Sequence, residues 1–134
     1  MQKAILIDPE TKTISPLHDF TDDLQYHYRT IGNGCRTIDI QSIGDLPNGR
    51  SVDMVIDDEG RFNGELQNAF RFATSPEGQG IMNRAIICIG NDNTGSLEPI
   101  PDSLFNLIFN LIAQQIQWLS AADLDDPKIE IISF

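Results

Sequence analysis

A continuous apolar segment, Ala85–Ile89, is the feature that most constrains the fold. Neither of the two faces that a strand would give this segment carries a charged or amide side chain, and Gly90–Asn93 follows it with turn-forming residues. A strand without a polar face must be covered on both sides. The segment therefore predicts a central strand between two layers. A chain of 134 residues is long enough to supply both layers within one domain.

Shorter segments with alternating apolar residues predict the neighbouring strands. Two of them flank the Asp8-Pro9 turn, and two more flank an Asn48-Gly49 turn, so we expect two hairpins. The expected strands cover residues 3–7, 11–17, 35–42, 52–56, 69–73, 85–89 and, at the C-terminus, 128–134.

Two segments have helical spacing. The first is a short helix over about residues 21–31, with Thr21 as its cap, and the second is a long apolar helix over about residues 102–120, which starts at Asp102. These elements predict one α+β domain over residues 1–134, with a mostly antiparallel sheet of about five to seven short strands.

The long helix raises the question of a membrane, because residues 103–122 carry no charge. Four polar residues nevertheless recur at helical spacing and form a stripe along one face, which is typical of a helix packed in a soluble protein. They are Asn106, Asn110, Gln114 and Gln117. We therefore expect no membrane span.

The apolar residues of this helix form more than the narrow stripe that one small sheet would cover. Either the helix lies in the centre of the core, or part of it forms a homodimer interface. The residues expected in such an interface are Phe105, Phe109, Ile112, Ile116 and Trp118.

The charge balance indicates the kind of partner. The chain has 20 acidic and 9 basic residues, a formal net charge of -11. The basic residues are scattered singly, which argues against direct binding of nucleic acid, whereas a basic protein would be attracted. An acidic composition also serves solubility alone. The candidate acidic binding surface consists of Asp22, Asp23, Asp53, Asp57, Asp58 and Glu59.

The sequence contains no recognised arrangement of catalytic or metal-binding residues. Five candidate ligands fall between His18 and His27, but their spacing matches no known metal motif, so we expect no bound metal and no cofactor. A small-ligand- or metal-dependent enzyme using this acidic cluster with Asp53 or Asp57 is the alternative hypothesis. Cys35 and Cys88 are expected to be buried free thiols, although a disulfide between them stays open.

Several segments together resemble an uncharacterised family of small phage- and plasmid-borne proteins. They are the K-A-I-L-I-D-P opening (Lys3–Pro9), the L-P-N-G turn (Leu46–Gly49), the V-x-D-D-E-G turn (Val55–Gly60) and the glycine-bearing loop before the apolar strand. The resemblance implies an accessory protein of a mobile element in a bacterial cytoplasm.

No catalytic constellation stands out, and the chain is acidic. The leading hypothesis is therefore a non-catalytic protein-binding module. In its sharper form, the module mimics the charge of nucleic acid and occupies a basic site on a host factor.

Overall fold

The main sheet is built around β7 (Ala85–Asn91), the apolar strand expected from the sequence. The computed structural model describes residues 2–73 and 80–124. β4 (Arg50–Asp57) pairs with one side of β7, while β1 (Ala4–Asp8) and β8 (Ser96–Glu98) follow one another along its other side. All seven residues of β7 are buried. The prediction of a central, doubly covered strand is confirmed.

Two further strands complete the sheet, whose pairs are all antiparallel. β2 (Thr13–Leu17) lies at one edge and β3 (Ile38–Leu46) at the other, in the order β2-β1-β7-β4-β3. Both predicted hairpins, β1–β2 and β3–β4, are present. Three residues, Pro47–Gly49, connect β3 to β4, with Asn48 and Gly49 at φ 65° and 72°, the left-handed conformation that Asn and Gly adopt most readily.

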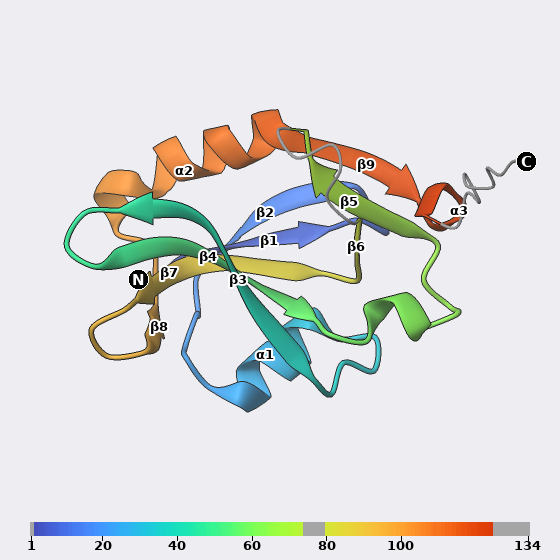
Figure 1. Ribbon diagram of the computed structural model, residues 1–134, viewed down its shortest axis with the longest axis horizontal. Helices are drawn as coiled ribbons and strands as arrows, with labels where there is room; N and C mark the ends of the chain where they lie inside the picture. The colour runs from blue at the N-terminus through green and yellow to red at the C-terminus, as the bar shows by residue number, and fades with distance from the viewer. Residues whose placement is uncertain (1, 74–79, 125–134) are drawn as a thin grey trace, which may run out of the picture.

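Helices cover both faces of this sheet (Figure 1). α2 (Asp102–Gln115) lies over one face and α1 (Leu24–Ile31) over the other. The two cores contain different residues of β4 and β7, because successive side chains of a strand alternate between faces. The α2 side includes Met54, Ile87, Phe105, Ile108 and Ile112, and the α1 side includes Tyr26, Ile31, Val55, Ile86 and Cys88.

α1 is shorter than the helix expected over about residues 21–31. Asp23, not Thr21, caps it: the Asp23 side chain accepts a hydrogen bond from the backbone N–H of Gln25 at 3.2 Å. Asp22 does not cap the helix, because its Oδ2 accepts a hydrogen bond from the backbone N–H of Leu97 at 2.9 Å. Two acids stand in succession at this point, so the sequence alone does not identify the cap.

The prediction of a long apolar helix over about residues 102–120 is wrong. α2 ends at Gln115, and residues Ile116–Ser120 form β9, which pairs with β5 (Asn68–Phe72). β5 also pairs with β6 (Ile81–Met82), so β6-β5-β9 is a second, three-stranded sheet that the sequence did not indicate. Ile116 is β-branched and Trp118 aromatic, and residues of both kinds fit a strand when a neighbouring strand offers hydrogen-bond partners.

Two short turns of helix, η1 (Gly60–Phe62) and α3 (Ala121–Leu124), complete the described chain. The strand expected over residues 128–134 lies outside the described residues. No helix within residues 2–73 and 80–124 has the length and apolarity needed to cross a bilayer. The described part of the chain forms a single α+β domain.

Gly90 is required by the close approach of β4 to β7. A Cβ atom at this position would overlap the carboxylate of Asp53 and lie 2.9 Å from Ser51 Oγ. We expect Gly90→Ala to lower the free energy of unfolding by about 1–3 kcal/mol, the usual cost of forcing atoms into a packed site. Urea denaturation followed by Trp118 fluorescence measures it.

Two comparisons test that explanation. Gly64→Ala, where a Cβ would meet nothing within 4 Å, should change stability by less than about 0.5 kcal/mol. In an Asp53→Ala background, Gly90→Ala should cost much less, because the colliding carboxylate is gone. An equal cost in both backgrounds would contradict the assigned clash.

Candidate functional site

A groove of about 1030 Å³ runs between α2 and the β3–β4 hairpin. It extends from the hairpin turn, where Leu46 and Leu104 line it, to β5 and β6, where Phe72 and Ile81 line it. α2 shares one core cluster with β1, β4 and β7, and the groove lies between the helix and the edge of the sheet formed by β3 and β4. Its volume is at the upper end of the range for ligand sites.

The floor and one wall of the groove are apolar. The floor comes from β4 and the wall from α2, with Val52, Met54, Ile56, Ile108 and Ile112 among the lining residues. At the mouth, Leu107 is 58% and Leu111 48% exposed. These two leucines are four residues apart and therefore share one helix face. Exposed leucines beside an apolar floor are typical of a binding surface.

Charged residues surround this apolar floor. Four aspartates are among the residues that line the groove: Asp39, Asp45, Asp57 and Asp58. The strand register places the Asp39 side chain on the groove face, opposite Ile56, whereas Asp45, opposite Ser51, and Asp57, two residues after Val55, direct theirs to the α1 side. Two guanidinium groups, those of Arg61 and Arg71, lie toward the β5 end, where Arg71 Nε donates to Gln117 Oε1 at 2.8 Å. The groove therefore carries an excess of negative charge.

The six acids expected to form one binding surface are distributed over three places. Asp22 and Asp23 lie at the start of α1. Asp53 is buried, and its Oδ1 accepts a hydrogen bond from Ser51 Oγ at 2.7 Å. Asp57, Asp58 and Glu59 follow one another at the end of β4, and the first two reach the groove.

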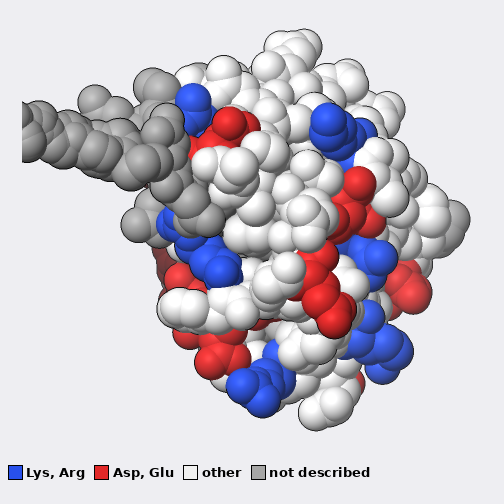
Figure 2. All heavy atoms as spheres, turned by 90° about the vertical axis from the view of Figure 1, so that its right-hand side faces the viewer, with Lys and Arg blue, Asp and Glu red and all other residues white. Residues whose placement is uncertain are grey.

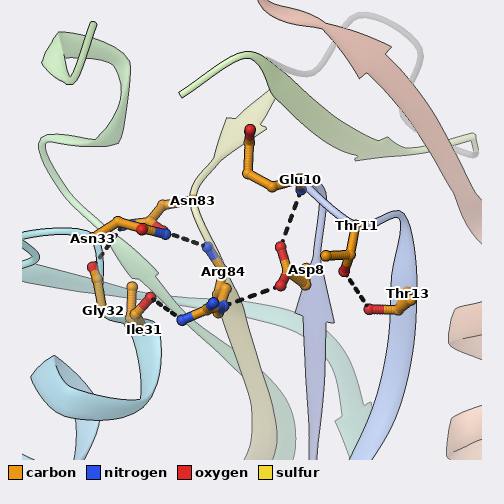
Figure 3. Close-up of polar contacts among 9 residues, drawn as sticks. All are labelled: Asp8, Glu10, Thr11, Thr13, Ile31, Gly32, Asn33, Asn83 and Arg84. Carbon is orange, nitrogen blue, oxygen red and sulfur yellow. Dashed lines mark hydrogen bonds and ion pairs between the residues drawn. The ribbon is translucent and has the colours of Figure 1, made fainter. Parts of the chain in front are cut away.

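Asp57 is held in place by the polar network drawn in part in Figure 3. Asn83, at φ 74° and fully buried, donates from Nδ2 to Asp57 Oδ2 at 2.8 Å and to the Gly32 carbonyl at 3.1 Å. Its Oδ1 accepts from Asn33 Nδ2 and from the Arg84 backbone N–H, each at 2.9 Å. Every hydrogen-bonding atom of the Asn83 amide is used within the protein, so this cluster is structural.

The same network continues to β1. Arg84 Nε donates to Asp8 Oδ2 at 3.1 Å, and Asp8 Oδ1 accepts the Glu10 backbone N–H at 3.0 Å (Figure 3). The Glu10 carboxylate accepts the backbone N–H groups of Gln67 and Asn68 at the start of β5. The network thus joins the main sheet to the second sheet, and so fixes the β5 end of the groove.

Of the five residues expected in a homodimer interface, Phe105 and Ile112 are buried in the core. Phe109, Ile116 and Trp118 are partly buried and pack against that core. The apolar residues that α2 exposes are instead Leu107 and Leu111. Sequence reasoning missed this pair, although their spacing of four on a helix was the available signal.

The cluster from His18 to His27 offers little chemistry. His27 is 2% exposed, with Nε2 3.4 Å from Asp22 Oδ1, and its ring packs near Phe20 and Tyr26. Asp19 accepts a hydrogen bond from the Tyr26 hydroxyl. Within the described ranges, no group of three or more His, Cys, Asp or Glu is arranged to hold a metal ion.

Both cysteines are free thiols. Burial raises the pKa of Cys35 to about 11, and the nearby Asp57 and Glu59 carboxylates act in the same direction. Burial raises the pKa of Cys88 further, assisted by Asp53 and Asp22. Neither thiol forms a thiolate readily near neutral pH, so neither has the character of a nucleophile.

Comparison with known proteins found no match: no family model, no curated protein and no solved structure is similar to this chain. The interpretation of the groove therefore depends on its own geometry.

Asn83→Gly tests the structural role of the network. Glycine accepts the left-handed backbone, so the substitution removes the amide alone and should lower the free energy of unfolding by about 2–4 kcal/mol. Asn48→Gly is the matched control, because Asn48 is exposed and also left-handed at φ 65°. It should change stability by less than about 0.5 kcal/mol in the same chemical denaturation. Equal effects of the two substitutions would show that Asn83 acts through its backbone only.

Proposed function

We propose that this chain is a protein-binding module and that the groove between α2 and the β3–β4 hairpin receives an apolar, basic segment of a partner protein. The observation that carries the proposal is an apolar groove whose lining includes Asp39 and Asp58, with Leu107 and Leu111 exposed at its mouth. Burying such leucines contributes about 1–2 kcal/mol each, which gives affinity, while the carboxylates select the charge of the partner.

Long-range electrostatics supports a basic partner over a second copy of this chain. Each copy has a formal net charge of -11, so two copies repel one another. The same charge attracts a segment rich in lysine or arginine, and the Asp39 carboxylate on the groove face provides a close contact for it. Homodimerisation through this face is therefore the less favoured arrangement.

A mimic of nucleic acid would need acids gathered over one broad surface. On the face drawn in Figure 2, the Lys and Arg side chains are interspersed with Asp and Glu. That face therefore does not supply the uniform acidic surface that such a mimic needs. The alternative of an enzyme at the His18–His27 cluster gains no support from the burial of His27.

Selection from a randomised peptide library tests the proposal without assuming how the peptide folds. The purified protein should enrich peptides that combine apolar residues with Lys or Arg. Their binding should be at least tenfold weaker to a Leu107→Ser, Leu111→Ser double variant, because tenfold is equivalent to about 1.4 kcal/mol and two leucines contribute more. Binding should weaken further at high salt.

The matched control is a Leu24→Ser, Phe62→Ser double variant. Both residues are exposed apolar side chains, 49% and 87% respectively, and neither lines the groove. This variant should bind the selected peptides as tightly as the unaltered protein. Equal loss in both double variants, or enrichment of acidic peptides, would refute the proposal. A dimer seen by light scattering and lost in the groove variant would favour self-association instead.

A further inference from the structure

We infer that the partner segment binds in extended form, as an added strand along the free edge of β3, with its side chains reaching the groove beside α2. This inference rests on the function proposed above and specifies the conformation of the partner. Strand addition to an open sheet edge is a common mode of peptide recognition, in which main-chain hydrogen bonds give affinity and pockets select alternate side chains.

The edge is available. β3 pairs with β4 along its length, from Ile38 opposite Asp57 to Leu46 opposite Arg50. Within the part of the chain that the structure describes, no strand pairs with the other side of β3. An exposed edge of nine residues is a ready template for a further strand.

The backbone of Ile40 points toward this free side. Its N–H donates to the neighbouring Asp39 Oδ1 at 3.0 Å. In an antiparallel pair, the N–H and C=O of one residue both point toward the partner strand or both away from it, and this bond identifies Ile40 as pointing away from β4. A carbonyl of an incoming strand would replace the Asp39 carboxylate as acceptor. Asp39 would then be released to pair with a cationic side chain.

Apolar side chains are exposed on both sides of the sheet near β3, and this favours a bound strand over a bound helix. Leu107 and Leu111 are exposed on the groove side and Ile40 on the α1 side. Gln41 is opposite Met54, on the groove side, whereas Ile40 is opposite Val55, on the α1 side. Ile40 is 46% exposed. A helix lying in the groove would cover Leu107 and Leu111 but leave Ile40 in water. An added strand directs alternate side chains to both faces and covers all three.

The geometry also defines the partner's pattern. A register shift between Ser42 and Gly44 interrupts the regular ladder, so the added strand pairs along Ile38–Ser42. The Asp39 side chain shares the groove face with Ile56. It favours a lysine or arginine at the adjacent end of the segment, followed by apolar side chains toward the groove floor. This chain's own residues 125–134 contain three acids and one lysine, and they lack that complementarity.

Methylation of alternate backbone nitrogens of the peptide distinguishes a bound strand from a bound helix. The probe is the most enriched peptide from the library, made in two forms that carry N-methyl groups on odd or on even residues. In an added strand, only alternate N–H groups bond to β3, so one form should lose at least tenfold in affinity and the other should retain it. Loss in both forms, as for a bound helix, or in neither would overturn the inference. Groove-dependent binding of the unmethylated peptide would still support the proposed function.

A protein variant gives an independent check. Ile40→Lys adds a positive charge beside the bound strand and should weaken the same peptide at least fivefold. Leu24→Lys adds the same charge at a similarly exposed leucine outside β3, and should leave affinity unchanged. Both variants should retain the thermal unfolding midpoint, since both side chains are already exposed. Equal affinities of the two variants would contradict strand addition.

Discussion

The arrangement of the whole domain depends on the buried amide of Asn83. The residue lies between β6 and β7 with no exposed surface, and its four hydrogen bonds reach the end of α1, the end of β4 and the start of β7. A buried amide left without partners costs about 1–3 kcal/mol for each unsatisfied group. The three elements must therefore converge on this point. The direction in which β7 enters the sheet, and with it the pairing of β4 and β1, follows from that convergence.

The groove is a consequence of the same geometry. One helix, α2, cannot cover a sheet face that extends from β2 to β3, and a groove remains between it and the β3–β4 hairpin. After Gln115 the chain turns into β9 and pairs with β5, so the second sheet closes one end of the uncovered part. If residues 116–120 had continued as helix, β5 would keep only its two-residue pairing with β6 and lose its five-residue pairing with β9. The strand that sequence reasoning missed thus helps to create the candidate site.

The sequence indicates the hairpins and the central strand because their signals are local. Alternation of apolar and polar residues and an Asn-Gly turn are patterns of a few residues, and the apolar segment of β7 is continuous in the sequence. The identity of β9 is different, because its apolar residues suit a helix or a strand and pairing with Asn68–Phe72 decides between them. The Asn83 network is also beyond local reasoning: Asp8 and Arg84 are separated by 76 positions in the chain.

Sequence analysis anticipated the acidic character of the candidate site but not its position. An acidic balance suggested a basic partner, and the acids at the end of β4 do reach the groove. Asp53, from the same set, is buried because it faces the α1 side of β4 and bonds to Ser51. Which acids share a surface depends on strand register, where a shift of one residue reverses the face of every side chain.

Acids on the β3 edge have two physical effects at once. Charged residues on an open edge oppose pairing between identical chains, and here every copy carries the same negative charge. The same charge attracts a basic segment, so in the complex that we propose the feature that keeps copies apart would also select the partner. Asp39 combines both effects in one side chain: its carboxylate occupies the Ile40 N–H while the edge is free. A partner strand must displace that bond, and it can offer the carboxylate a cationic side chain in return.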